Sequence, residues 1–550
     1  MKRVLLFIIG ISAALWAREA EYLRNLPFEM PAIKQTSFPE RDFNILDFGA
    51  TGDGHTLNTR AINRAMEAAA SAGGGRVVIP RGIWLTGPIR LKSNINLHLE
   101  AGALVLFSSD LKEYEIIETV WEGRPQKRFI SPLYGKDLEN IAITGKGVFD
   151  GSGDKWRPVL KWEMTAGQWQ ALVQRGGTVT RQWGTDVWWP SQQAARGAET
   201  VKALDKREAP LEEYRKAGEY LRPVLLSLVN CRRVLLDGPT FQNSPAWNIH
   251  PRECEDVIIR NITVRNPWYS TNGDGLDIES SKNVLVHSST FDVGDDAICL
   301  KSGRDAYGRA LGKPSENIVI ANCTVYNGHG GFVIGSEMSG GVRNVLVRDC
   351  LFIGTDLGLR FKSARGRGGV VENIYIRDIL MKDIHTDAIR FNTFYRGVSP
   401  KESFGRADYK KQTPAPVTEE TPLFRNIYME NIVCSGAGRA AFIQGLPEQA
   451  VRGIEIKNLR VSADQGITVV NTDGLKFIDS SLDIPQGETV YIVNSRDIAF
   501  VANHPPAGAL RVWLAGPKTG AVLFKGYDPR EITESLRLDN DVPNRPRIER

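Results

Sequence analysis

The segments NVLVHSSTF (283–291), NIVIANCTV (317–325) and NVLVRDCLF (344–352) share one pattern: an Asn, then apolar residues alternating with others. Similar segments begin at Asn140, Arg233, Asp256, Asn373 and Asn426. Alternation with a period of two predicts a short strand in each segment. The starts lie about 23 to 34 residues apart except where insertions intervene. One such strand cannot bury its inner face alone, whereas stacked coils share a continuous core. We therefore predict an all-β fold, a right-handed parallel β-helix.

The two ends of the chain fit this architecture. A helical pattern from residue 59 to about residue 72 predicts a helix that caps the N-terminal end of the solenoid, and residues 77–79 follow as a strand. Weaker alternation beyond residue 475 predicts further coils rather than a separate domain. A β-propeller is the competing architecture, but its blades need longer units of four strands.

Two segments interrupt the repeat. The first, 156–221, holds half of the 12 tryptophans, namely Trp156, Trp162, Trp169, Trp183, Trp188 and Trp189, and a helix is expected to begin after Thr165. These rings could form a sugar-stacking wall or a small satellite core, and both interpretations stay open. The second, 395–422, is polar, contains Pro and predicts a surface loop. Residues 18–550 are thus expected to form one catalytic domain with two insertions.

The first 17 residues resemble a secretory signal peptide, because basic Lys2 and Arg3 precede an apolar run too short to span a bilayer. We expect a secreted or periplasmic protein with no membrane attachment after cleavage. Six cysteines lack any CxxC pair, so a zinc site is not expected; Cys231, Cys254, Cys299, Cys323 and Cys350 are interpreted as buried residues at equivalent repeat positions. The formal charge of +5 comes without a basic run, which argues against a nucleic-acid partner.

Candidate site residues fall on four successive repeats. Asp274 and Asp295 are 21 residues apart, about one coil, and strands of neighbouring coils lie about 4.8 Å apart. Asp296 follows Asp295 directly. The next repeat carries His329, and the one after it carries Arg360 and Lys362, which share one face of a strand because they are two residues apart.

This set suits hydrolysis of a glycosidic bond. That reaction needs one protonated carboxyl for the leaving oxygen and one ionised carboxylate to activate water. Repulsion within a group of carboxylates raises the pKa of at least one of them. Arg360 and Lys362 suit a sugar that bears a carboxylate, so the expected substrate is a polymer of uronic acid. Asp277 is expected to be structural.

At these residues the sequence resembles glycoside hydrolase family 28, the polygalacturonase family. The motifs occur in order: NGD (272–274, usually with Thr in the middle), GDD (294–296), GHG (328–330) and RFK (360–362). The resemblance implies hydrolysis of α-1,4-galacturonosidic bonds in pectin or polygalacturonate with inversion and without a cofactor or metal. It implies these roles: Asp295 as general acid, Asp274 and Asp296 on the water, His329 tuning the acid, Arg360 and Lys362 on the galacturonate carboxylate, and Asn272 orienting the site. Tyr395 could contact the sugar or be an ordinary surface residue.

Three alternatives remain open. A pectate lyase would share the solenoid but cleave by elimination with calcium. A non-catalytic sugar-binding β-helix would not need the paired carboxyls. Rhamnogalacturonan hydrolase is the nearest alternative within the family. We predict exo action that releases galacturonic acid, because the insertion 156–221 could close one end of the groove and bacterial exo-acting members carry comparable insertions.

Overall fold

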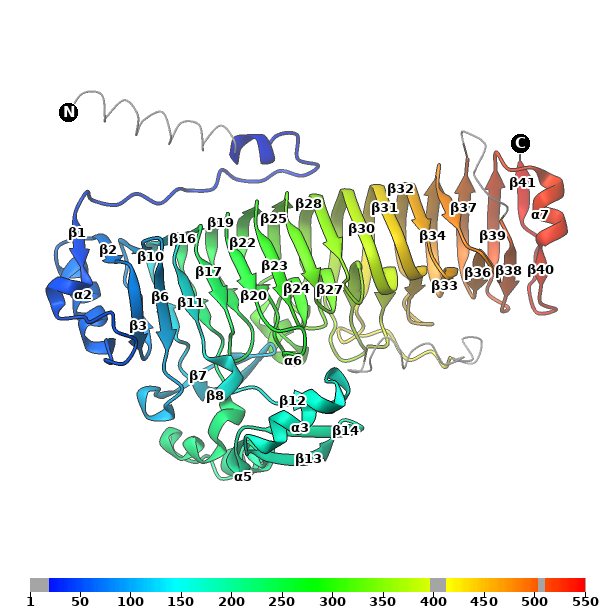
Figure 1. The fold of residues 1–550 in the computed structure, drawn as a ribbon. Coiled ribbons are helices and arrows are strands. Elements are labelled where there is room, and N and C mark those ends of the chain that lie inside the picture. The colour runs from blue at the N-terminus through cyan, green and yellow to red at the C-terminus, as the bar shows by residue number, and fades with distance from the viewer. Residues whose placement is uncertain (1–18, 396–411, 503–509, 550) are drawn as a thin grey trace.

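The computed structural model describes residues 19–395, 412–502 and 510–549. Within these residues, 36 strands belong to one sheet that winds along a single long axis (Figure 1). Strands of successive coils pair in parallel, as in β16 (Arg232–Asp237) with β19 (Glu255–Arg260) and β21 (Leu276–Glu279) with β24 (Asp296–Lys301). The predicted parallel β-helix is therefore confirmed, and the propeller alternative is wrong.

The coils build three faces. The first face holds β1 (Asp42–Asn44), β2 (Gly75–Ile79), β5 (Ile95–Leu99), β10 (Glu139–Gly145), β16 (Arg232–Asp237), β19 (Glu255–Arg260), β22 (Lys282–His287), β25 (Ser315–Ala321), β28 (Val342–Ile353), β30 (Val370–Asn392), β31 (Leu423–Gln444), β32 (Val451–Ser462), β34 (Thr472–Ile478), β37 (Arg496–Val501), β39 (Gly520–Lys525) and β41 (Arg547–Glu549). The second holds β3 (Gly82–Thr86), β6 (Ala103–Phe107), β11 (Val148–Asp150), β17 (Thr240–Gln242), β20 (Thr263–Arg265), β23 (Thr290–Val293), β26 (Thr324–Asn327) and β35 (Ser481–Asp483). The third, which carries the site, holds β4 (Ile89–Arg90), β9 (Leu133–Lys136), β15 (Leu226–Val229), β18 (Ile249–Arg252), β21 (Leu276–Glu279), β24 (Asp296–Lys301), β27 (Gly330–Ile334), β29 (Leu359–Lys362), β33 (Gln465–Val470), β36 (Val490–Val493), β38 (Val512–Ala515) and β40 (Arg537–Leu538). Long strands such as β30 turn the corner and continue from one face to another.

The Asn that opens each repeat has a structural reason. Asn283, Asn317, Asn344 and Asn373 all adopt φ between 55° and 56°, in the left-handed region that Asn tolerates better than most residues. Their side chains form a ladder along the axis. Asn317 donates to Asn283 at 3.2 Å, Asn344 to Asn317 at 3.1 Å and Asn373 to Asn344 at 3.3 Å. The recurring Asn thus turns each coil and links it to the next.

The core is one apolar cluster that runs the length of the solenoid, from Ile45 to Ile532. All six cysteines are buried and free. The thiols of Cys231, Cys254, Cys323 and Cys350 each donate to the carbonyl two residues earlier, which confirms their equivalent positions. The prediction is wrong for Cys299, which lies within β24 and donates instead to Gly335.

Both ends are covered as expected. Helix α2 (Thr59–Ser71) buries Ile62 and Met66 against the first coils and confirms the predicted N-terminal cap. At the other end, the coils continue through β41, next to helix α7 (Pro529–Ser535) (Figure 1). The predicted further coils are confirmed.

Two additions project from the same side of the solenoid (Figure 1). One is an antiparallel hairpin of β7 (Ile116–Trp121) and β8 (Arg124–Phe129), which sequence analysis missed. The other is the insertion 156–221, which holds β12 (Val159–Leu160), α3 (Ala166–Gln174), β13 (Thr178–Gln182), β14 (Thr185–Trp189), α4 (Gln192–Ala195), α5 (Gly197–Lys206) and the 3-10 helices η4 (Lys161–Glu163) and η5 (Leu211–Leu221). Thr165 caps α3 as predicted, in a capping box with Gln168.

The tryptophans of the insertion divide between the two interpretations. Trp156, Trp188 and Trp189 are buried, and Trp156 packs edge-on against Phe129 of the hairpin, with 5.7 Å between ring centroids. Trp162 and Trp183 are each 58% exposed. Trp156 belongs to a buried cluster that joins the insertion to the hairpin, and Trp189 belongs to a second cluster within the insertion.

Described residues from 19 onward run along the outside of the solenoid, where Tyr22, Leu26 and Phe28 pack against its strands (Figure 1). The predicted signal peptide, residues 1–17, and most of the predicted loop 395–422 lie outside the described residues. Among the described residues, no helix is both long and apolar enough to span a membrane.

Candidate active site

The four sequence motifs meet on the third face. Asp274 lies just before β21, Asp296 begins β24, His329 lies just before β27, and Arg360 and Lys362 lie in β29. These strands are consecutive neighbours, with β21 beside β24, β24 beside β27, and β27 beside β29. The expectation that one residue set would converge from successive coils is confirmed.

Three carboxylates form the centre of the site. Asp274, Asp295 and Asp296 each offer an oxygen within 4.8 Å of the other two. Burial raises the pKa of Asp274 well above its usual value, and the carboxylates of Asp295 and Asp277 raise it further. One oxygen of Asp274, Oδ1, is buried without a hydrogen-bond partner among the described residues. The environment of Asp274 therefore favours its protonated form.

Asp296 has the opposite environment. Lys362 donates to its Oδ2 at 2.6 Å and Arg360 donates to its Oδ1 at 2.9 Å. Burial by itself would raise the pKa of Asp296, but Lys362, Arg360 and Lys301 outweigh burial and hold it far below its usual range. The pKa of Asp296 is therefore lowered, whereas that of Asp274 beside it is raised.

Arg360 and Lys362 thus do more than sequence analysis predicted. Two cations face the single charge of Asp296, so one positive charge remains for a substrate carboxylate. Tyr395 lies beside them, with its ring centroid 5.1 Å from Lys362 Nζ and 5.6 Å from Arg360 Cζ. Three oxygens this close could also attract a metal ion, but the two cations already neutralise one of the three carboxylates.

His329 is held by a carboxylate that sequence analysis missed. Its Nδ1 donates to Asp356 at 2.6 Å, and Asp356 also pairs with His385 at 3.3 Å. Burial would lower the pKa of His329, but the Asp295 carboxylate and Asp356 outweigh burial and raise it to about 9. His329 is therefore an imidazolium next to Asp295, whose carbonyl accepts a hydrogen bond from the His329 backbone N–H at 3.0 Å. Asp356 is 27 residues, or one coil, after His329, a spacing that could have revealed it.

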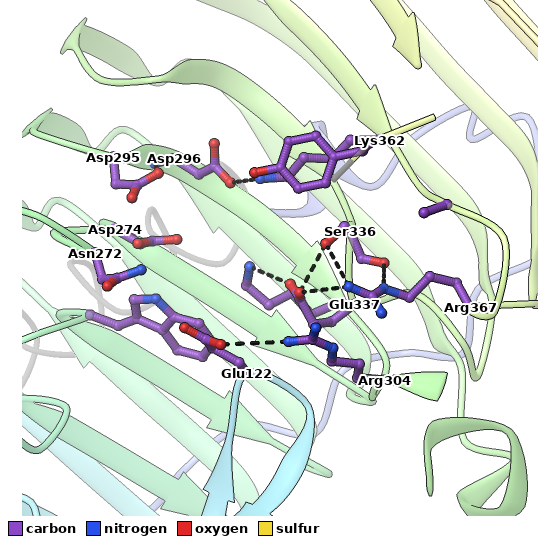
Figure 2. A pocket seen from close by; sticks show the side chains of 14 residues that line it. Glu122, Asn272, Asp274, Asp295, Asp296, Arg304, Ser336, Glu337, Lys362 and Arg367 are labelled. Carbon is purple, nitrogen blue, oxygen red and sulfur yellow. Dashed lines mark hydrogen bonds and ion pairs between the residues drawn. The ribbon is translucent and has the colours of Figure 1, made fainter. Parts of the chain in front are cut away.

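A cavity of about 440 Å³ opens beside the carboxylates. Figure 2 shows Asp274, Asp295 and Asp296 at one side of it and Arg304, Glu337 and Arg367 at the other. Its lining is Glu122, Trp247, Asn272, Asp274, Asp295, Asp296, Lys301, Arg304, Ser336, Glu337, Lys362, Ala364, Arg367 and Tyr395. None of these residues belongs to the insertion 156–221, whereas Glu122 comes from the β7–β8 hairpin. The hairpin, not the insertion, therefore contributes to the cavity lining.

The floor of this cavity is a buried charge network. Lys301 lies 3.4 Å from Asp277 and 3.3 Å from Glu337, with Nζ 4.8 Å from the centroid of the Trp247 ring. Asp277, expected to be structural, is fully buried, and burial raises its pKa to about 8 although Lys301 opposes this. Sequence analysis missed Lys301 because a lone Lys at a strand end gives no local signal.

Asn272 is fixed by an arginine just past the insertion. Arg222 donates to Asn272 Oδ1 at 2.7 Å and to the carbonyl of Thr271 at 2.6 Å. At the next position, a Cβ added to Gly273 would lie 1.9 Å from Ser270 Oγ. This turn has no room for a larger residue, which explains why Gly273 replaces the usual Thr.

Comparisons with known proteins match this geometry. A family model described as glycosyl hydrolases family 28 matches residues 212–421, which contain all four motifs. A solved structure of a hyperthermoactive exopolygalacturonase from Thermotoga maritima is 34% identical, with a TM-score of 0.66, and the alignment covers 84% of this chain and 95% of that one. The chain belongs to glycosyl hydrolases family 28. It is therefore a glycoside hydrolase.

Other relatives of this family 28 chain agree. An exo-poly-alpha-D-galacturonosidase from Dickeya chrysanthemi is 30% identical over 384 residues, which are 68% of this chain and 59% of that protein. A probable polygalacturonase from Vitis vinifera is 29% identical over 428 residues, or 76% and 74% of the two chains. A second model, for rhamnogalacturonase A/epimerase and pectate lyase-like proteins, matches only residues 43–102, before the site.

The insertion also brings a further carboxyl to this site. Glu163 ends the short helix η4, and its Oε2 is buried without a hydrogen-bond partner among the described residues. Burial raises the pKa of Glu163 to about 7; His329 opposes this and Asp295 adds to it. The charges of His329 and Asp295 thus act on Glu163, which does not line the cavity.

Proposed function

We propose that this glycoside hydrolase cleaves α-1,4-galacturonosidic bonds of polygalacturonate and releases galacturonic acid from chain ends. One observation carries the proposal: three clustered carboxyl groups, of which Asp274 has a raised pKa and Asp296 a lowered pKa, adjoin two buried cations at one side of a cavity. The unlike carboxylates supply an acid and a base, and the cations supply the charge that a uronic acid needs. The printed names of the Thermotoga and Dickeya relatives support exo action.

The residues take the roles that the resemblance implies. Asp295 protonates the leaving oxygen, and the imidazolium of His329 nearby favours transfer of that proton. Asp296, held ionised by Lys362 and Arg360, and Asp274 position the attacking water. Arg360 and Lys362 also bind a galacturonate carboxylate with their remaining positive charge, Asn272 orients the site, and Tyr395 packs against the sugar.

Inversion of configuration comes from the family resemblance. The carboxylate oxygens lie within 4.8 Å of one another, closer than the roughly 6.5–9.5 Å common between the two carboxyls of inverting enzymes. The relation between carboxyl separation and stereochemistry applies to sites with two carboxyls. Here a third carboxyl is present, so the attacking water can lie between Asp274 and Asp296. Proton NMR of the first anomer formed decides the point: β-galacturonate supports inversion, and α-galacturonate rejects it.

Product analysis over time on polygalacturonic acid tests the main proposal, with the Asp295→Asn variant as control. Galacturonic acid alone from the earliest sample supports exo hydrolysis. A ladder of oligomers rejects exo action while keeping the hydrolase. Unsaturated products that absorb ultraviolet light would establish a lyase instead. Turnover of rhamnogalacturonan but not polygalacturonate would establish the alternative hydrolase, and unchanged turnover by Asp295→Asn would reject the assigned acid.

We also propose that residues 1–17 are removed during export, so that the enzyme meets pectin outside the cytoplasm. The support is the basic and apolar pattern of those residues. Mass spectrometry of the secreted protein tests this. A mature chain that begins at Arg18 agrees with the proposal, and an intact Met1 contradicts it.

A further inference from the structure

The tip of the β7–β8 hairpin rests on the coil that follows β24. Gly123 accepts a hydrogen bond at 2.9 Å from the backbone N–H of Arg304, and Arg124 pairs with Asp305. The contact is tight, because a Cβ added to Gly123 would lie 2.7 Å from the Arg304 nitrogen. These contacts hold the tip of the hairpin against Arg304. The paired residues Arg124 and Asp305 are 181 positions apart in the sequence.

Aromatic stacking fixes the tip of the hairpin to the floor of the cavity. Trp121, at the end of β7, stacks on Trp247 with 4.6 Å between ring centroids and 29° between ring planes. The Arg128 guanidinium lies 4.1 Å from the centroid of the Trp121 ring on the same strand pair, and Lys301 lies over Trp247. Offset stacks and cation–π contacts of this kind hold a hairpin in place as well as burying it.

Arg304 differs from the other cations around the cavity. Its nearest carboxylates are Glu122 at 3.6 Å and Asp305 at 3.5 Å, both too far for a hydrogen bond. Within the described residues its side chain donates no hydrogen bond, and its Nε is buried without an acceptor. Arg367, by contrast, already donates to Ser336 and Asp305. The two terminal nitrogens of Arg304 thus keep donors available at the cavity wall, while Glu122 and Asp305 offset part of its positive charge.

Cations therefore line this cavity at more than one place. Lys362 lies on the side of Asp296, to which it donates, and Arg304 lies across the cavity from the three aspartates, next to Glu337 and Arg367 (Figure 2). Each residue of polygalacturonate carries one carboxylate, so a chain seated at the carboxylates presents a second anion to the cavity. A guanidinium with a free fork is the side chain that binds such a group in two parallel hydrogen bonds.

We propose that Arg304, presented by the tip of the β7–β8 hairpin, binds the carboxylate of the chain-terminal galacturonate, so that this hairpin restricts cleavage to chain ends. The proposal rests on the proposed exo-hydrolysis of polygalacturonate. It assigns the restriction to a segment outside the Trp-rich insertion, which contributes no residue to the cavity lining.

The first experiment moves the hairpin tip with the Gly123→Ala variant. Its added Cβ meets backbone atoms of Gly303 and Arg304, so the tip must shift, and we expect this shift to open the cavity. Gly184→Ala is the matched control, since Gly184 also has a positive φ (79° against 67°) but no atom within 4 Å of its Cβ. We expect oligomers beside monomer from Gly123→Ala and monomer alone from Gly184→Ala. Monomer alone from both variants overturns the role of the hairpin.

The second experiment tests Arg304 itself. The kcat/KM values of wild type, Arg304→Gln and Arg304→Lys are measured on trigalacturonate and on its methyl ester. Loss of a charge-assisted contact predicts a fall of about 10- to 100-fold for Arg304→Gln on the free acid, a smaller fall for Arg304→Lys, and little change on the ester. Equal losses on acid and ester overturn the proposal.

These outcomes separate the two proposals. If wild type releases no galacturonic acid, the proposed function fails. The other case is that wild type is an exo-hydrolase for which Arg304→Gln leaves the ratio of kcat/KM on the free acid to kcat/KM on the ester unchanged. In that case only the assignment of Arg304 fails. A thermal melt of each variant accompanies the kinetics, and Arg304→Lys keeps the test valid if Arg304→Gln unfolds.

Discussion

Removing the Lys362 ammonium should change both the stability of the protein and its pH profile through Asp296. The side chains of Lys362 and Asp296 are buried, with 8% and 1% of their surface exposed. Lys362 Nζ lies 2.6 Å from Asp296 Oδ2. Breaking a buried ion pair by removing one partner costs about 3–5 kcal/mol. Arg360 remains at 2.9 Å, so the carboxylate keeps one charged partner. The expected loss for Lys362→Gln is therefore that of one charged hydrogen bond, about 1.5–3 kcal/mol.

The sign of the pH dependence follows from the lowered pKa of Asp296. Its folded-state pKa lies below the unfolded value of about 3.9. The stability it contributes is therefore fully present above that value and is lost as pH falls toward the folded pKa. In Lys362→Gln the folded pKa of Asp296 rises. The stability difference from wild type should thus be largest at neutral pH and shrink in acid.

Urea unfolding midpoints at pH 7 and pH 3.5, with kcat/KM from pH 3 to 7, provide the assay. The acidic limb of kcat/KM should move to higher pH in Lys362→Gln, because Asp296 must be ionised to act on water. Lys382→Gln is the control; its pair with Asp383 is 63% exposed on both sides and should matter by at most about 1 kcal/mol. An unmoved acidic limb, together with an equal stability loss at both pH values, would refute the role given to Lys362.

Three further predictions concern the ladder, the histidine and metal dependence. Asn344→Ala should destabilise the protein by about 1–2 kcal/mol more than Asn344→Gly, because only the former must hold a Cβ at φ 55°; urea unfolding of both variants measures this, and equal losses would contradict it. Asp356→Asn should lower the pKa of His329 from about 9 and move the basic limb of kcat/KM to lower pH, and an unmoved limb would show that His329 does not act through its charge. A chelator should leave the initial rate on polygalacturonate unchanged, whereas calcium-dependent elimination would lose its activity.

Much of this protein could be predicted from short-range patterns. The alternation after each Asn, the capping helix and the order of the four motifs indicated the solenoid, and one residue set converged on the third face as expected. A coil of a β-helix contacts mainly the coils before and after it, so residue spacing translates almost directly into position. The same logic would have reached Asp356, one coil after His329.

The rest depended on contacts that no spacing encodes. The pairing of both Arg360 and Lys362 with Asp296 follows from side-chain geometry across three coils, not from their alternation in one strand. The hairpin that brings Gly123 to Arg304 is held by contacts such as the stack of Trp121 on Trp247, 126 residues away in sequence. Local sequence decides which residues form strands. The packing of a projecting segment is decided by burial against residues far away in the chain. Here that packing makes the β7–β8 hairpin part of the cavity lining.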